Sequence, residues 1–213
     1  MSTKIRPVFD ASAGGPNGVS LNDVVEVGPP LMPNMLTVLL RFRRWRFGIC
    51  ADIVKAFHQI KIATCDQDAH RFFWRRGERT RVMRFERVVM GVACSPFLLN
   101  ATVKHHLSLY PGSPVVGELI ESLYADDWLS GCDSEQSAVS MLAEARAIMG
   151  AAGMELAKCS SNSPVLLDKL QLQGQQHPTS ETTRVLGVTW CREDDTLSFA
   201  GDQLQRGLCR QSE

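Results

Sequence analysis

The sequence shows no excess of charge of one sign, no long apolar run and no paired cysteines. It has 213 residues with 23 Lys+Arg against 23 Asp+Glu, and the resulting net charge of zero at first argues against a nucleic-acid partner. The longest uncharged stretch, Val88–Val103, contains Pro96 and Asn100 and falls short of the roughly 20 apolar residues that span a bilayer. We therefore expect no membrane segment, and no basic-then-apolar signal segment opens the sequence.

Cysteine and histidine are present but lack the spacing of a metal site. The seven cysteines stand singly, and an odd, dispersed set of thiols is typical of reduced cysteines in an intracellular protein. The five histidines also fall outside any metal-ligand spacing, which disfavours a metal-dependent hydrolase. With 44% hydrophobic and 22% charged residues, the chain is typical of a globular protein of one domain or two small ones.

The neutral total hides an uneven distribution of charge. Residues 41–87 contain 13 basic and five acidic residues, a net charge of +8, so the rest of the chain carries −8. Aromatic residues such as Trp45 and Trp74 lie among the basic ones, and this combination suits phosphate contact together with base stacking. A solvated charged surface over a hydrophobic core would give the same pattern. Composition therefore permits a nucleic-acid partner without requiring one.

Hydrophobic periodicity and turn residues predict alternating helices and strands. Ser95 and Pro96 are typical of a helix start, with Ser95 as the cap and Pro96 in the first turn. Ser134 caps another expected helix, which ends at Gly153. We further expect a helix over 34–46, strands over 47–53, 57–63, 185–190 and 196–199, hairpins over 72–86 and 119–132, and a loop over 171–183. Because a hairpin requires antiparallel pairing, the predicted fold class is α+β rather than a doubly wound parallel sheet.

Two acidic features stand out from this background. Asp52 ends an apolar strand, and Asp126 and Asp127 stand together at the tip of the expected 119–132 hairpin. Neighbouring carboxylates repel each other unless a cation or basic partner compensates them, and Mg²⁺ prefers carboxylate oxygens. If strand and hairpin are neighbours, three carboxylates converge at one sheet edge, as two-metal phosphoryl transfer requires. Aspartates are also common in turns and as helix caps, so each feature alone has an ordinary structural interpretation.

Seven short blocks follow one another along the chain: Arg6–Asp10, Ser20–Asp23, Ala51–Phe57, Met90–Phe97, Tyr124–Asp127, Gly153–Lys158 and Leu186–Trp190. In this order they resemble the successive blocks of a retroelement reverse transcriptase. The overlapping runs Val8–Ala13 and Ser95–Thr102 look most like the BEL/Pao class of long-terminal-repeat retrotransposons. The resemblance covers about residues 4–190.

The resemblance implies roles for particular residues. Asp52, Asp126 and Asp127, with the backbone carbonyl of Ile53, would hold two Mg²⁺ ions, or Mn²⁺ in their place. A second group would serve the incoming deoxynucleoside triphosphate: Arg6 on its phosphates, Phe57 as the bulky ring that excludes a 2′-hydroxyl, Gly91 in shaping the nucleotide surface, and Lys158 as proton donor to pyrophosphate. A third group would contact primer and template: Tyr124, Ser95, Pro96, Leu186, Gly187 and Trp190. Phe57 and Trp190 are also of the types that most often fill a core, and Lys158 of the type that is most often exposed.

The resemblance also implies an organisation. Residues 1–190 would form a right-hand polymerase palm, a ferredoxin-like antiparallel sheet with two packed helices, plus partial fingers. Thumb and RNase H would be absent, and residues 191–213 stay unassigned. The fingers would comprise about 1–30 and 60–88, and the palm about 31–59 and 89–190. The expected partners are a primed RNA or DNA template, dNTPs and the protease, RNase H and integrase of a polyprotein, in the cytoplasm or a virus-like particle.

Two functions of different classes follow. The first is an RNA-directed DNA polymerase domain, favoured by the intact set of three aspartates. The second is a truncated retroelement fragment that folds but does not polymerise, and at most binds nucleic acid through residues 41–87.

Overall fold

The computed structural model describes residues 8–172 and 181–199, so Arg6 and most of the unassigned tail lie outside the described residues. The chain divides into two compact units. The first comprises Met1–Leu31 with Lys55–Leu109, and the second comprises Met32–Val54 with Tyr110–Glu213. These units are defined by contacts within the chain, whereas the fingers and palm were expected from the family resemblance. The expected bounds of fingers and palm stay a prediction.

The second unit is built on a four-stranded antiparallel sheet with strand order β4-β5-β1-β6. Its central strand is β1 (Phe47–Ile53), which matches the predicted range and is buried over most of its length. The neighbouring strands are β5 (Asp127–Cys132), β4 (Leu123–Tyr124) and β6 (Leu156–Ser161). Antiparallel pairing throughout the sheet confirms the predicted α+β class.

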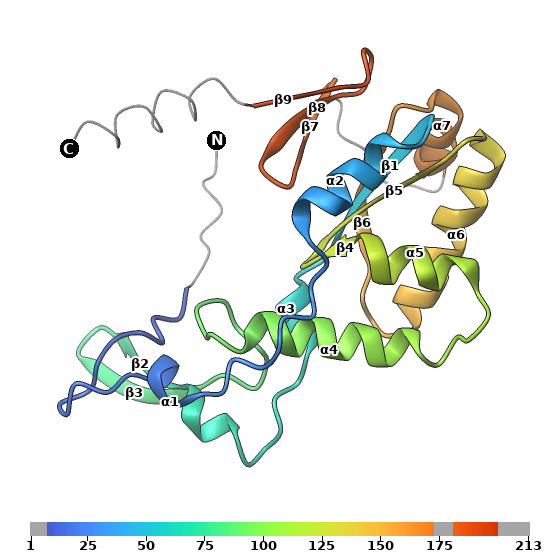
Figure 1. The fold of residues 1–213 in the computed structure, drawn as a ribbon. Coiled ribbons are helices and arrows are strands. Elements are labelled where there is room, and N and C mark those ends of the chain that lie inside the picture. The colour runs from blue at the N-terminus through green and yellow to red at the C-terminus, as the bar shows by residue number, and fades with distance from the viewer. Residues whose placement is uncertain (1–7, 173–180, 200–213) are drawn as a thin grey trace. The chain divides into compact units, whose positions relative to one another are not determined.

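Helices α2 (Met35–Arg43), α5 (Pro114–Ser122), α6 (Glu135–Ala151) and α7 (Pro164–Leu172) pack around this sheet (Figure 1). Cap residues explain where two of them begin, and of these only Ser134 was predicted. The Asn34 side chain accepts hydrogen bonds from two free amides of α2, and the Ser134 side chain accepts one from the amide of Ser137 in α6. Both helices were expected from their apolar spacing, and both are confirmed.

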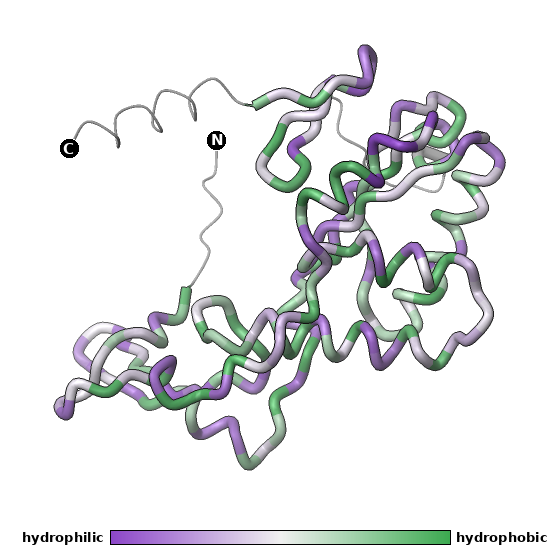
Figure 2. Tube along the Cα trace, viewed as in Figure 1, coloured by the Kyte–Doolittle hydropathy of each residue, from purple (hydrophilic) through white to green (hydrophobic). Residues whose placement is uncertain are grey.

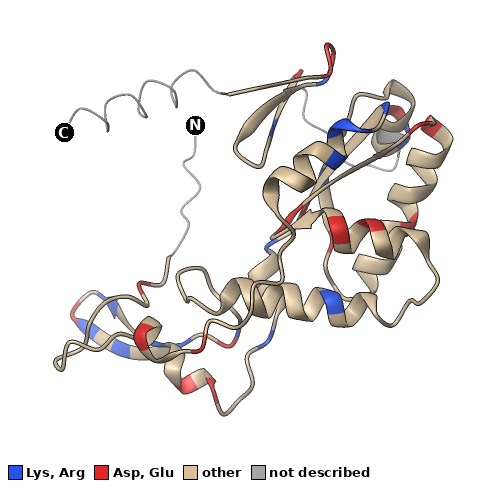
Figure 3. Cartoon of the chain, viewed as in Figure 1, with Lys and Arg blue, Asp and Glu red and all other residues tan. Residues whose placement is uncertain are grey.

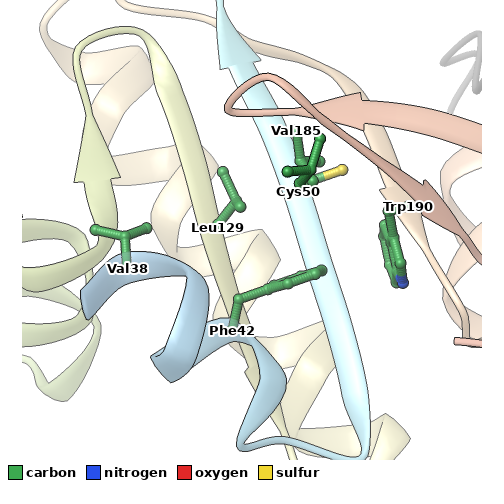
Figure 4. Packing of buried hydrophobic residues seen from close by; sticks show 7 residues of the cluster. Val38, Phe42, Cys50, Leu129, Val185 and Trp190 are labelled. Carbon is green, nitrogen blue, oxygen red and sulfur yellow. The ribbon is translucent and has the colours of Figure 1, made fainter. Parts of the chain in front are cut away.

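A smaller antiparallel sheet packs against α2 in the second unit. It consists of β7 (Thr182–Val185), β8 (Val188–Cys191) and β9 (Thr196–Ser198). Trp190 is fully buried, and its ring meets that of Phe42 edge-on at 4.8 Å between centroids. Figure 4 shows this cluster, in which Cys50 and Leu129 of the larger sheet join the two rings. The small sheet and α2 therefore share one hydrophobic core.

The first unit has less regular structure. Its hairpin pairs β2 (Arg71–Arg76) with β3 (Arg79–Arg84) about Gly77, as predicted, and α4 (Ser95–Leu107) is its longest helix within the described residues. A small hydrophobic core in this unit consists of Ala11, Val89 and Val92. The remaining elements are single turns: α1 (Leu21–Val24), α3 (Ala56–Gln59) and the 3-10 turn Gln67–His70.

Several local predictions were wrong. The strand expected over 57–63 begins as α3, and only Lys61 makes an isolated bridge, to Arg87. Residues 119–122 belong to α5, whose buried residues Val115, Leu119 and Ser122 have helical spacing. The strand expected over 185–190 is instead a tight hairpin, since Leu186 and Gly187 both have positive φ.

Three further differences concern helix ends and a missed strand. Ser95 is not the cap of α4, because Cys94 holds that position and the Ser95 hydroxyl donates to the carbonyl of Val89 at 2.7 Å. Of the loop expected over 171–183, residues 171–172 end α7, residues 182–183 begin β7, and residues 173–180 lie outside the described residues. Strand β6 was not predicted. In the part of the chain that the structure describes, no helix has the length and apolar character needed to cross a bilayer.

Candidate active site

The antiparallel register of β1 and β5 brings the separate acidic features together. Asp52, near the end of β1, stands directly opposite Asp127, the first residue of β5. Asp126 lies in the adjoining turn, where its carbonyl accepts a hydrogen bond from the Ile53 amide at 2.8 Å. The turn is tight because Ala125 has a φ of 53°. All five residues belong to the second unit, at one end of its sheet.

Burial and repulsion act on the same carboxylate at this end of the sheet. Burial is the largest cause, and together with the charges of Asp52 and Asp126 and a hydrogen bond with Asp52 it raises the pKa of Asp127 to about 7. Lys158 acts in the opposite direction and lowers the pKa of Asp127. Ionisation of Asp127 is therefore unfavourable near neutral pH, and a cation beside these carboxylates would offset the repulsion.

A β-bulge places Lys158 next to these carboxylates. The register pairs Cys50 with Ser160 but Asp52 with Ala157, so two residues of β6, Lys158 and Cys159, stand against a single residue of β1. Lys158 has a φ of 50°, in the left-handed region that such irregularities use. Its ammonium forms an ion pair with Oδ2 of Asp52.

The residues at this site fit a hard divalent cation by their chemistry. Carboxylate oxygens are the ligands that Mg²⁺ prefers, and a cation would relieve the repulsion between Asp52 and Asp127. Over residues 8–172 and 181–199, no three His, Cys, Asp or Glu side chains are grouped closely enough to form a complete metal site. Further oxygen ligands would therefore come from backbone, water or substrate.

The remaining predicted residues of the second unit lie in different surroundings. Tyr124 pairs with Asp127 across the β4–β5 hairpin and is half-buried. Leu186 and Gly187 form the turn between β7 and β8, with φ values of 47° and 85°. The Trp190 indole donates a hydrogen bond to Asp195 at 2.9 Å from inside the core. Of these residues, only Tyr124 is paired directly with an aspartate of the site.

Four predicted residues belong to the first unit. Phe57 is half-buried in α3, Ser95 is buried, and Pro96 lies in the first turn of α4. Gly91 has a φ of 103°, and a Cβ there would lie 1.9 Å from the carbonyl oxygen of Phe9. The structure therefore explains Gly91 and Ser95 by packing within their own unit.

Asn22 positions the loop before α4, a role that the sequence did not predict. Its side-chain amide donates to the carbonyl of Gly91 at 3.0 Å and accepts from the amide of Ala93 at 2.8 Å. It thereby fixes the loop before α4 from both sides. Its place in the Ser20–Asp23 block was the available signal, but the contact spans about 70 residues of sequence and cannot be read from local pattern.

Trp128 fixes the β4–β5 hairpin, which carries Asp126 and Asp127, to the rest of the second unit. It is fully buried, pairs with Ala51 in β1 and Leu123 in β4, and donates from Nε1 to the hydroxyl of Ser122 at 3.1 Å. The Ser122 hydroxyl donates in turn to the carbonyl of Glu118. This chain of hydrogen bonds ties the residue after Asp127 to the last turn of α5.

Replacing this anchor should destabilise the second unit measurably. We expect Trp128→Phe to lower the free energy of unfolding by about 2 kcal/mol, from one lost hydrogen bond and a small cavity. Ser122→Ala should cost about 1–2 kcal/mol by leaving the buried indole N–H unpaired. Urea unfolding of both variants and the double variant checks this. The double variant should cost less than the two changes added, and strict additivity would show that the two side chains do not interact.

With the geometry of the site established, comparison with known proteins identifies its family. Residues 12–190 match the family model described as "Reverse transcriptase (RNA-dependent DNA polymerase)". The chain belongs to the reverse transcriptase family. This agrees with the resemblance seen in the sequence. No curated protein matches the chain.

Solved structures with the same fold include proteases-reverse transcriptases of foamy virus. One, in complex with an RNA/DNA hybrid, is 18% identical with a TM-score of 0.59, over 88% of this chain and 22% of that one. Another, in complex with double-stranded DNA, is 18% identical with a TM-score of 0.62, over 94% of this chain and 29% of that one. The native prototype foamy virus protein is 16% identical with a TM-score of 0.56, over 88% of this chain and 22% of that one. The chain thus spans between a fifth and a third of these reverse transcriptase chains, and the likeness shows their fold.

Proposed function

We propose that this chain is the RNA-directed DNA polymerase domain of a BEL/Pao-type retrotransposon, which joins deoxynucleotides from dNTPs to a primer 3′-hydroxyl. The observation that carries the proposal is the alignment of Asp52 opposite Asp127, with Asp126 in the adjoining turn, in a chain of the reverse transcriptase family. The BEL/Pao class is supported by the runs Val8–Ala13 and Ser95–Thr102.

The proposed chemistry assigns a task to each group at the end of the sheet. Asp52, Asp126 and Asp127, with the Ile53 carbonyl, would hold two Mg²⁺ ions, or Mn²⁺, which when bound stabilise the charge that develops on the transferring phosphate. The β4–β5 hairpin and β1 orient these carboxylates, because the register of β5 with β1 places Asp127 opposite Asp52. Lys158 brings a positive charge beside Asp52, close to where a pyrophosphate leaving group would need a proton.

The β2–β3 hairpin of the first unit supplies a cationic, aromatic surface. Arg76 and Arg79 stand directly opposite each other, and Arg81 stands opposite Trp74. Like charges in opposite positions destabilise a hairpin unless an anion lies over them. No acidic side chain pairs with Arg76, Arg79 or Arg81 in the described part of the chain. Phosphate contact by these arginines and base stacking on Trp74 would suit a nucleic-acid template.

The basic segment 41–87 is divided between the two units, with residues 41–54 in the second and residues 55–87 in the first. Figure 3 shows Lys and Arg on the β2–β3 hairpin of the first unit and towards the C-terminal end of α2 in the second. In the second unit, Arg41 forms ion pairs with Glu118 and Glu121, and Arg43 pairs with Asp195. The hairpin is hydrophilic along much of its length (Figure 2). The proposed template contact therefore rests on the hairpin rather than on the whole segment.

A primer-extension assay tests the proposed activity directly. With an RNA template, a DNA primer, dNTPs and Mg²⁺, the chain should extend the primer, and Asp126→Asn should reduce the rate at least about 100-fold, since the loss of a metal ligand removes several kcal/mol of stabilisation. Asp168→Asn, an exposed acid in α7, is the matched control and should change the rate less than about twofold.

The same assay separates the two candidate functions. Binding of the primer–template is measured in parallel by fluorescence anisotropy. If the unmutated chain binds the primer–template but does not extend it, the polymerase proposal is wrong for this chain, and the alternative of a fragment that only binds nucleic acid stands.

A further inference from the structure

The bulge in β6 aims one positive charge at one carboxylate. Without the extra residue, the Ala157–Asp52 pairing would continue regularly and the alternation of β6 would place Lys158 elsewhere. The left-handed φ of Lys158, 50°, is unfavourable for a residue with a side chain. The resulting ion pair with Oδ2 of Asp52 is the only side-chain hydrogen bond that Lys158 makes within the described residues.

The Lys158 side chain has little other purpose in packing. It is 74% exposed, whereas the side chain of Asp52 is only 33% exposed. The exposed Lys158 ammonium therefore reaches a carboxylate that is more deeply buried than its own side chain. Removing the ammonium therefore changes the charge at Asp52 without removing packing atoms from the core.

We infer that Lys158 and a divalent cation compete for the carboxylate of Asp52, so that Lys158 lowers the affinity of this site for the cation. The inference rests on the proposed function, since it assumes that Asp52 is a ligand. It differs from proton donation to pyrophosphate, because it concerns the site before any nucleotide is bound. A cation can reach Oδ2 of Asp52 only when the ammonium withdraws, and a dication also repels the ammonium that stays nearby.

The size of the effect follows from ordinary ion-pair energetics. Exposed ion pairs are worth about 0.2–1 kcal/mol, which corresponds to a factor of about 1.4–5 in a dissociation constant. Repulsion between a dication and an ammonium several ångströms away, screened by water, adds a contribution of similar size. Removing the charge of Lys158 should therefore tighten cation binding about threefold to tenfold.

Cation affinity can be measured without any catalytic readout. The metal-stripped chain, with no nucleic acid or dNTP present, is titrated with Mn²⁺, and free Mn²⁺ is followed by electron paramagnetic resonance. Lys158→Met and Lys158→Gly should both bind Mn²⁺ about threefold to tenfold more tightly than the unmutated chain. Glycine adopts a positive φ freely, so Lys158→Gly keeps the bulge even if methionine disturbs it.

Three matched variants test whether Mn²⁺ affinity depends on the positive charge at residue 158 rather than on any exposed lysine. Lys158→Arg keeps the positive charge and should stay within about twofold of the unmutated chain. Lys169→Met removes an exposed lysine from α7 and should leave Mn²⁺ affinity unchanged. Asp127→Asn should weaken binding strongly, which shows that the titration reports on this site.

The outcomes distinguish this inference from the proposed function. If Asp127→Asn weakens Mn²⁺ binding but both neutral variants at Lys158 bind equally or more weakly, competition by Lys158 is overturned and the metal site stands. If Asp127→Asn leaves Mn²⁺ affinity unchanged, the metal site itself is wrong and the inference falls with it.

Discussion

Asp127→Asn should stabilise the chain against thermal unfolding at pH 8 in the presence of EDTA, and should remove the stabilisation that Mg²⁺ confers. Because burial and two neighbouring carboxylates raise the pKa of Asp127 to about 7, an ionised Asp127 weakens the folded state. Between about pH 4 and pH 7 the folded state binds more protons than the unfolded state, so the stability of the unmutated chain falls as the pH rises through this window. Asparagine has a similar shape and no charge to repel.

The size and pH dependence of this effect are both measurable. After allowance for solvent screening at a carboxylate that is only partly buried, we expect about 1–2 kcal/mol, or roughly 3–6 °C in melting temperature, at pH 8. The difference should shrink as the pH is lowered to 5. Scanning calorimetry at pH 5, 6, 7 and 8, with and without Mg²⁺, provides the measurement.

An exposed acid provides the control for Asp127. Asp133→Asn, just beyond β5, should change the melting temperature by less than about 1 °C under all conditions. A lower melting temperature for Asp127→Asn at pH 8 in EDTA would contradict the repulsion described here. Such a result would mean that Asp127 is held by favourable contacts rather than against unfavourable ones.

Gly91→Ala should unfold or severely loosen the first unit. Gly91 has a φ of 103°, and a Cβ there would meet the backbone oxygen of Phe9 at 1.9 Å and its carbonyl carbon at 3.0 Å. The Phe9 backbone cannot simply move away, because its amide donates to the carbonyl of Met90 and its ring packs edge-on against Phe85. Positive φ and overlap together should cost about 3–5 kcal/mol.

Gly77→Ala is the matched control for this substitution. Gly77 also has a positive φ, 60°, but nothing lies within 4 Å of a Cβ at that position in the hairpin turn. Its replacement should cost about 1 kcal/mol, from backbone strain alone. Hydrogen exchange of amides in α4 and the β2–β3 hairpin would report the loosening of the first unit. Equal protection in the two variants would show that the Phe9 contact does not constrain Gly91.

Gly91 has a structural reason to be glycine besides the nucleotide-binding role that the family resemblance implies. The resemblance places Gly91 at the nucleotide surface, whereas the structure shows a backbone-to-backbone approach that only glycine permits. A loss of nucleotide binding in Gly91→Ala would therefore follow from the displaced loop that Asn22 also holds. The proposed contribution of Gly91 to nucleotide binding stays a prediction.

Elements governed by local pattern were predictable from residues alone. The strand over 47–53 matches β1, since a short apolar run bounded by charged residues suits a strand buried on both faces. The hairpin about Gly77 and the helix after Ser134 follow from turn and cap residues. Residues 119–122 were expected in a strand but belong to α5, which packs against β5 in the tertiary structure.

The residues of the candidate site were predictable from the sequence, but their alignment in space was not. Asp52, Asp126 and Asp127 were singled out by residue type and by the order of the family blocks. Their alignment depends on the antiparallel register of β1 with β5, which joins segments about 75 residues apart. Register follows from which side chains reach the core and cannot be read from either strand alone.

The neutral composition of this chain illustrates the limit of sequence. The sequence by itself determined the α+β class, the family, and the presence of a basic region and three conspicuous aspartates. Only the tertiary structure decided which charges meet. Arg41 and Arg43 pair with acids of the second unit, Arg71 and Arg84 of the β2–β3 hairpin pair with Asp68, and Lys158 reaches Asp52. Within the described residues, no acid pairs with Arg76, Arg79 or Arg81. The physical reason is that charge interactions fall off steeply with distance in water, so their effect depends on spatial neighbours that strand register and one β-bulge determine.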